Sequence, residues 1–171
     1  MRRSEIVPEP EYYSRYINLV EDEDLMAAFE RSFKQITGLD INALNEIGDK
    51  IYATGKWPVK EILQHITDWE RILSYRTLLI ARKDTTAPAG HDQDLLAMHS
   101  CVGRRNIEAI LNELKAVRFS TIQMFKSFDE ETLLNRGICW QYEVSVLEMG
   151  FMIIGHQIHH LKIVKEKYFD L

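Results

Sequence analysis

The feature that most limits the fold of this chain is its scarcity of proline. Only four prolines occur among 171 residues, at positions 8, 10, 58 and 88, and long stretches between them lack helix breakers. Because proline disrupts helix interiors, such stretches are free to form long helices. Hydrophobic residues make up 46% of the chain, which is enough to bury a core at this length. We therefore expect an all-α protein with a single domain over residues 1–171.

Apolar residues at helical spacing predict four long helices and two short segments. Gly38 is placed to end the first long helix, and Pro58 suits the first turn of the second. Ser145 and Glu148 form a capping-box pattern at the start of the fourth. Four helices of this length predict a four-helix bundle with short extra helical segments. The long helices are expected at 22–37, 58–82, 102–128 and 145–168, and the short segments at 41–51 and from 129.

The remaining segments are expected to connect or cover the bundle. Residues 83–90 have loop composition, and residues 136–142 are predicted to be a connection. The first 20 residues are expected to form an N-terminal extension in which Tyr12, Tyr13 and Tyr16 pack over the bundle.

Composition excludes several classes of protein. The net charge is −5, which argues against binding to nucleic acid because such binding requires a basic surface. Cys101 and Cys139 are too few for a disulfide framework, so a reducing cytoplasm is expected. No apolar run approaches the ~20 residues of a membrane span, and the charged, proline-containing start does not resemble a signal peptide.

Three of the six histidines lie within residues 156–160 of the last predicted helix. His156 and His160 are four residues apart, so they share a helix face and can hold one metal ion together. His156 and His159 are three apart and share a face almost as well, so spacing alone leaves the pair open. We expect the His159 side chain to point outward or toward the residues that surround the metal ligands. His65, among apolar residues of the second long helix, could add a third imidazole from a neighbouring helix.

Each of these residues also has a purely structural interpretation, because a histidine on an apolar helix face is often just hydrogen-bonded in the core. His91 and His99 flank acidic residues in or near a loop and are weaker metal candidates, and Cys101 lacks a base at a useful spacing. Asp68 lies one turn after His65 and could orient a ligand imidazole. Glu70 is expected to be a solvated helix charge, although either carboxylate could shuttle a proton.

Four stretches resemble, in order, motifs of the DinB/YfiT-like superfamily. Residues 55–71 read GKWPVKEILQHITDWER and are similar to its GKWSVKEVLxHxxDxER stretch. Residues 90–94 (GHDQD) resemble its GFDQD loop, residues 113–118 (ELKAVR) its ELxxVR, and residues 155–160 (GHQIHH) its GHExHH. Together they span about two thirds of the chain. Pro58 stands where the family usually has a capping serine, and His91 replaces the family's phenylalanine, a change expected to alter the pocket wall.

The resemblance implies a four-helix bundle, often a homodimer, with a divalent metal held by three histidines. Carried over position by position, the ligands are His65, His156 and His160. Three imidazoles leave coordination positions open, and zinc and nickel both accept such a site. Members of the family include metal-dependent hydrolases and transferases that use a low-molecular-weight thiol such as bacillithiol or mycothiol.

Two enzymatic activities on a small molecule follow from such a site, with a slight preference for the second. In a hydrolase the nucleophile is activated water, with Asp68 or Glu70 moving its proton; in a thiol transferase it is the thiolate of a cosubstrate. The preference rests on the lack of a general base spaced into the histidine motifs. Arginines could favour an acidic thiol, and the candidates are Arg71, Arg76, Arg104, Arg105 and Arg118. The alternative is a non-catalytic metal-binding or dimeric interaction module.

Overall fold

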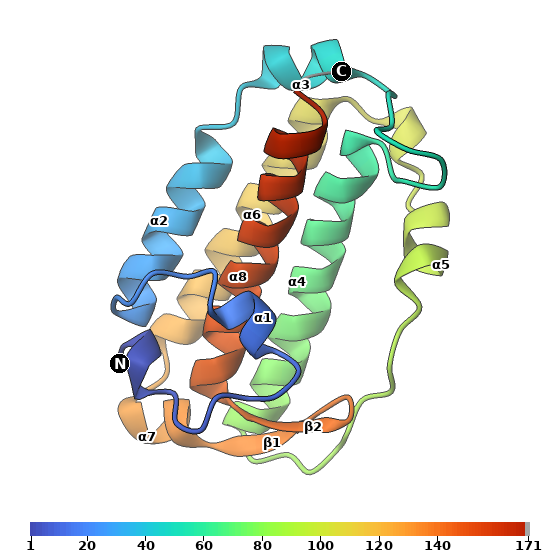
Figure 1. The fold of residues 1–171 in the computed structure, drawn as a ribbon. Helices are drawn as coiled ribbons and strands as arrows, with labels where there is room; N and C mark the ends of the chain where they lie inside the picture. The colour runs from blue at the N-terminus through green and yellow to red at the C-terminus, as the bar shows by residue number, and fades with distance from the viewer. Residues whose placement is uncertain (170–171) are drawn as a thin grey trace.

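The fold is a four-helix bundle, as the sequence predicts (Figure 1). The structure is a computed structural model that describes residues 1–169. Helix α4 (Val59–Ala81) packs against α6 (Ile107–Lys126) and α8 (Val146–Lys167), and α2 (Leu25–Thr37) packs against the same two helices, so the four long helices form a closed square. None of the described helices is long and apolar enough to cross a bilayer.

Side-chain caps determine where these helices begin. The Asp24 carboxylate accepts a hydrogen bond from the Met26 N–H at the start of α2, and Asn106 caps α6 in the same way. Ser145 and Glu148 form the expected capping box, with the Ser145 hydroxyl accepting from the Glu148 N–H at 3.1 Å. Pro58 lies one position earlier than expected: it precedes the first residue of α4 in an extended conformation.

Shorter elements join the long helices, and some differ from the sequence-based expectation. Residues 136–142 are not a simple connection, because a β-hairpin forms there with Cys139 paired to Tyr142. Trp140 adopts a positive φ of 61° in its tight turn. The predicted helix over 102–128 is divided, with an extended backbone at Arg105 and Asn106 between its parts. The short elements are η1 (Arg3–Glu5), α1 (Ser14–Ile17), α3 (Ile41–Ile47), α5 (Gln93–Met98), η2 (Val102–Arg104), α7 (Glu130–Leu134), β1 (Arg136–Cys139) and β2 (Tyr142–Ser145).

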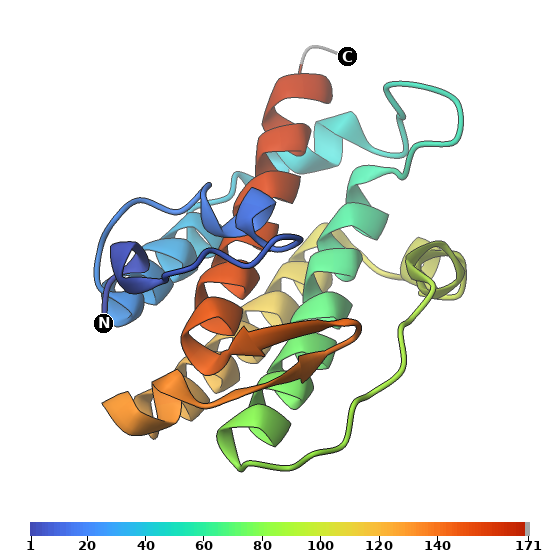
Figure 2. The same cartoon turned by 60° about the horizontal axis from the view of Figure 1, so that its bottom comes forward.

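These short elements lie over two parts of the bundle. The helix α1 packs on α8, which places the N-terminal segment against the middle of the bundle. The hairpin lies across the ends of α4 and α8, with β1 in contact with α4 and β2 with α8 (Figure 2). The long loop after α4 leads to α5, which lies beside α4.

The core contains a polar layer between two hydrophobic clusters. On every long helix, a buried polar residue lies between a member of one cluster and a member of the other. Buried polar groups in a bundle need partners inside it, so this layer is where specific chemistry can be built. The successive residues are Phe29, Ser32 and Ile36 on α2; Ile66, Glu70 and Leu73 on α4; Leu114, Arg118 and Ile122 on α6; and Ile154, His156 and Val164 on α8.

Candidate metal centre

Three histidines converge in this polar layer. The helix α4 supplies His65, and one face of α8 supplies His156 and His160, one helical turn apart. The Nε2 atom of His156 lies 3.2 Å from Nε2 of His65 and 3.1 Å from Nε2 of His160. One ring nitrogen from each of the three lies within 4.8 Å of the others, and no second cluster of this kind occurs among residues 1–169. His65 and His156 are buried and His160 is half-buried.

This arrangement fits a metal ion better than it fits hydrogen bonding. A ring nitrogen either donates one proton or offers one lone pair, so Nε2 of His156 cannot make good in-plane hydrogen bonds to two other ring nitrogens at once. Two nitrogens bound to one ion at ~2.0–2.1 Å lie roughly 2.8–3.4 Å apart for octahedral to tetrahedral angles. The distances at His156 fall in this range. The donor set, three imidazoles and no carboxylate, suits a divalent transition metal.

Burial keeps the three imidazoles neutral, which is the form that binds metal. Burial, with a smaller effect of His159, lowers the pKa of His65 from 6.5 to about 4. The pKa of His160 falls to about 3 through burial and its neighbours His65 and His159. Burial and the nearby His160 hold the pKa of His156 well below its ordinary value. Protons therefore compete weakly with a metal at neutral pH.

Aromatic side chains surround the cluster. The ring of His65 lies between Trp57 and Trp69, with centroid distances of 4.8 and 5.4 Å. Tyr16 on α1 contacts both His156 and His159 edge to face. His159 is half-buried beside the cluster without belonging to it, in keeping with the expected direction of its side chain. The expected packing of Tyr12, Tyr13 and Tyr16 against the bundle is observed, and Tyr16 contributes to the site itself.

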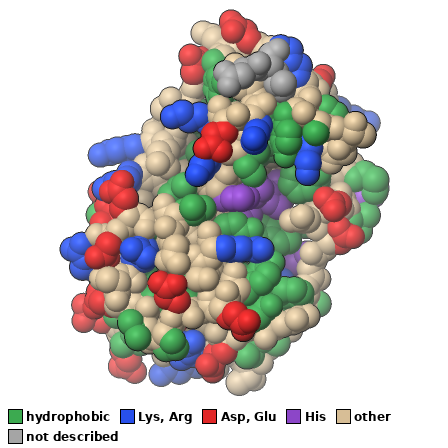
Figure 3. Space-filling view, viewed as in Figure 1, with side chains coloured by type: hydrophobic (Ala, Val, Ile, Leu, Met, Phe, Trp, Pro, Cys, Tyr) green, Lys and Arg blue, Asp and Glu red, His purple; other side chains and the backbone are tan. Residues whose placement is uncertain are grey.

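A cavity of about 570 Å³ opens onto His156. Figure 3 shows histidine side chains at the surface in a hollow bordered by hydrophobic side chains. Trp69, which also packs against the hydrophobic core, lines this cavity, and so does the exposed His91. The lining combines aromatic, basic and neutral polar groups, and no carboxylate occurs among its described residues. They are Tyr12, Tyr13, Arg15, Tyr16, Trp69, Leu73, Arg76, Gly90, His91, Gln93, Trp140, Met152 and His156.

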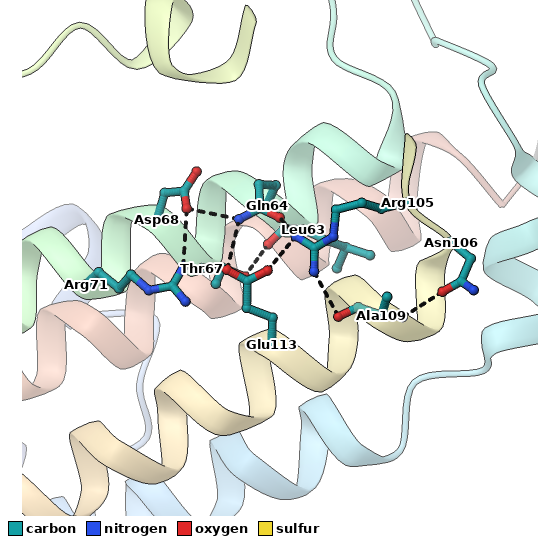
Figure 4. A network of polar contacts seen from close by, with 9 residues as sticks. All are labelled: Leu63, Gln64, Thr67, Asp68, Arg71, Arg105, Asn106, Ala109 and Glu113. Atoms are coloured by element: carbon teal, nitrogen blue, oxygen red, sulfur yellow. Dashed lines mark hydrogen bonds and ion pairs between the residues drawn. The ribbon is translucent and has the colours of Figure 1, made fainter. Parts of the chain in front are cut away.

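Asp68 is held in a polar network on the outer side of α4 (Figure 4). Its carboxylate accepts a hydrogen bond from Gln64 at 2.9 Å and lies 3.5 Å from Arg71. Glu113 on α6 pairs with both Arg71 and Arg105 in the same network. Burial raises the pKa of Asp68, although Gln64 and Arg71 oppose that shift. The described hydrogen bonds and ion pairs of Asp68 thus stay within α4, and none reaches a histidine; Glu113 links the network to α6 through Arg71.

The expectation of a solvated Glu70 is wrong. Glu70 is 2% exposed and accepts two hydrogen bonds from the fully buried Arg118, from Nε at 2.7 Å and from Nη2 at 2.9 Å. Arg118 also donates to the Ser32 hydroxyl. Glu70 faces the bundle interior because it lies one turn after the buried Ile66, whereas Arg71, the next residue, is exposed. This pair joins α4, α6 and α2 across the polar layer.

The other residues singled out from the sequence lie apart from the cluster. His99 and Cys101 are exposed beyond α5 and do not line the cavity. Of the five candidate arginines, only Arg76 lines it, and the exposed Arg15 joins it from α1. The sequence gives no indication that Arg15 lies at the cavity, because only the packing of α1 on α8 brings it there.

Comparisons with known proteins agree with the fold and identify the family. The chain superposes on YfiT from Bacillus subtilis, described as a probable metal-dependent hydrolase with an unusual four-helix bundle topology. The TM-score is 0.67 at 14% sequence identity, over 91% of this chain and 85% of YfiT. A comparison with curated protein sequences yields no match. A sequence model of the DinB superfamily matches residues 13–164, a range that contains all three clustered histidines. The chain therefore belongs to the DinB superfamily.

Proposed function

We propose that this protein is a metal-dependent enzyme that transfers a small thiol to an electrophilic small molecule. His65, His156 and His160 would hold the metal, in line with the convergence of their ring nitrogens. A divalent metal bound by three neutral imidazoles lowers the pKa of a coordinated thiol or water, and so supplies a nucleophile at neutral pH. The protein's own residues supply the neutral ligands and the pocket.

The observation that carries the choice of a thiol is the lining of the cavity. A general base is useful when water must lose its proton during attack, and such bases are most often histidine or a carboxylate. The cavity beside His156 has no carboxylate among its described lining residues, and Asp68 and Glu70 are engaged in ion pairs elsewhere. A thiol needs less help, because its pKa of about 8.5 is already close to neutral.

The aromatic lining supports a pocket for small organic molecules. Tyr16, Trp69 and Trp140 offer flat apolar faces, and a volume of about 570 Å³ suits a ligand of that size. Tyr16 and Trp69 also cover the histidines, which would limit access of bulk water to the reacting atoms.

A hydrolase is the second candidate, supported by the likeness of the fold to YfiT. In that case water would be the nucleophile, and His91 is an exposed side chain at the cavity wall that could accept a proton. A small-molecule substrate is common to both candidates. The homodimer and the cytoplasmic location stay predictions.

The decisive experiment measures product formation with and without a thiol. Zinc- or nickel-loaded protein is incubated with chlorodinitrobenzene and L-cysteine; the sulfur–carbon bond forms, chloride leaves, and the thiol proton passes to solvent. In parallel, nitrophenyl acetate is supplied with water alone. A product that requires both metal and thiol supports the transferase, whereas metal-dependent ester hydrolysis alone overturns it in favour of the hydrolase. Chelated protein and His160→Ala serve as controls. Metal binding without either product would favour a non-catalytic module.

A further inference from the structure

Among residues 1–169, the buried Arg76 has no carboxylate partner. It is 4% exposed on α4. Its Nη2 donates to the carbonyl oxygen of Ala89 at 2.8 Å, and its Nη1 lies 3.8 Å from the sulfur of Cys139. Its Nε is buried and has no hydrogen-bond partner. A guanidinium stays charged in proteins, so an unpaired one in the interior is costly unless it meets an anion.

The other buried arginine of the bundle shows what a structural role looks like here. Arg118 is fully buried, and both its Nε and its Nη2 donate to the carboxylate of Glu70. The equivalent Nε of Arg76 is left open. Arg118 therefore has a carboxylate counterion within the described protein, whereas Arg76 does not. Of the two, only Arg76 lines the cavity.

The cavity connects Arg76 to the histidine cluster along one face of α4. Trp69, Leu73 and Arg76 follow His65 at positions 4, 8 and 11 of a helical stripe, and all three line the cavity that also reaches His156. Eleven residues correspond to about 16 Å of helix axis. Along this stripe the cavity thus offers His156 of the cluster, then the apolar and aromatic side chains Trp69 and Leu73, and then the cationic Arg76.

We propose that Arg76 binds a carboxylate of the small-molecule ligand whose other end reaches the histidines. The open Nε–H and the second N–H of Nη2 form a planar edge that matches the two oxygens of a carboxylate. The exposed Arg15 at the same cavity adds positive charge, and no described lining residue repels an anion. This assignment deepens the proposed function and rests on it for the reactive end, but the carboxylate site itself exists without metal.

The test begins with chelated, metal-free protein, so that it does not depend on catalysis. Binding of phenylpentanoate and of its uncharged amide is followed by the fluorescence of the cavity residues Trp69 and Trp140 and by calorimetry. Wild type should bind the carboxylate about tenfold or more tightly than the amide, because the site then pairs its buried charge. Arg76→Met should remove this preference, and the matched control Arg82→Met, at the exposed end of the same helix, should retain it. Equal binding of the two compounds to wild type, or loss of the preference in both variants, overturns the assignment.

The thermal stability of the Arg76→Met variant tests the assignment of Arg76 without any ligand. If Arg76 serves a ligand, Arg76→Met should not lower the thermal midpoint, because it removes an unpaired buried charge. A large fall, like that expected for Arg118→Met, would instead make Arg76 a structural residue.

A second experiment tests whether one ligand reaches both Arg76 and the metal at the histidines. With cobalt-substituted protein, mercaptooctanoate should perturb the metal absorption spectrum at lower concentration than mercaptooctanol, and Arg76→Met should remove the difference. If the spectrum responds to neither thiol while metal-free protein still prefers phenylpentanoate, the proposed thiol chemistry fails and the carboxylate site stands.

Discussion

Gly155 on α8 lies directly against the backbone of Tyr16, so closely that a Cβ atom added at Gly155 would be 2.0 Å from the carbonyl oxygen of Tyr16. This contact lets α1 lie on α8 next to His156, and it puts the Tyr16 ring over His156 and His159. A residue without a side chain at this point therefore helps to build one wall of the candidate site.

Gly155→Ala should destabilise the protein and displace α1. Because the obstacle is backbone rather than a flexible side chain, we expect a loss of at least about 2 kcal/mol in the free energy of unfolding, measured by urea titration. The fluorescence of the tryptophans near the site should change at the same time. Gly103→Ala is the matched control, since no atom lies within 4 Å of its added Cβ. Equal stability of the two variants would refute the close approach.

The ion pair of Glu70 and Arg118 should be strongly coupled. Arg118→Met alone should cost about 3–5 kcal/mol, because it leaves the Glu70 carboxylate buried without a partner. The double variant Glu70→Leu with Arg118→Met should lose less than Arg118→Met alone. The exposed pair Lys162 and Glu166 provides the contrast, with an expected coupling below about 1 kcal/mol. Chemical denaturation of the two sets of variants measures both couplings, and additive losses at Glu70 and Arg118 would contradict a buried pair.

Metal content should distinguish the two adjacent histidines at the end of the GHQIHH motif. His160→Ala removes a nitrogen that lies 3.1 Å from Nε2 of His156, whereas His159→Ala removes a ring outside the cluster. Elemental mass spectrometry of untagged protein should find about one transition-metal equivalent per chain in wild type and His159→Ala, and much less in His160→Ala. Circular dichroism confirms that each variant is folded. Loss of metal in His159→Ala with retention in His160→Ala would reverse the assignment.

Metal-free protein should become less stable as the pH falls below about 6.5. The folded-state pKa values of His65 and His160 are lowered to about 4 and about 3, while those in the unfolded chain stay near 6.5. Between these limits the unfolded chain binds more protons, so the free energy of unfolding decreases toward acid pH, by up to about 1.4 kcal/mol per unit of pKa depression. Urea titrations in the presence of a chelator, at pH values between about 5 and 7, measure this effect. Most carboxylates stay ionised over that range and contribute little. A His65→Gln variant should show a shallower slope, and an identical slope would count against the buried neutral imidazole.

Asp68 should act in the network of Figure 4 rather than in catalysis. Asp68→Asn keeps the shape of the side chain and removes its charge beside Arg71. Because the pair is partly exposed, we expect a change of at most about 1 kcal/mol in stability and unchanged metal content. A kcat reduced by about a hundredfold or more at unchanged metal content would restore the proton-shuttle hypothesis.

Much of the architecture could be predicted from the sequence because its signals are local. Helical spacing of apolar residues predicts the four long helices, and the Ser145–Glu148 capping box marks the start of α8 as expected. The hairpin escaped prediction because its strands are four residues each, too short to show a clear alternation, and its turn requires a positive φ at Trp140, which lacks the usual turn chemistry.

The four-residue spacing of His156 and His160 is a property of the sequence alone, since it puts both rings on one face of any helix that forms there. Which ring from another helix meets them, and which of Asp68 and Glu70 is buried, are decided only by how α4 packs against α6 and α8. In the tertiary structure Arg76 lies at the cavity without a carboxylate partner among residues 1–169, and α1 lies close to Gly155 beside the histidines. Helical periodicity tells which side chains share a face, but the partner of each face is determined by contacts between residues far apart in the chain.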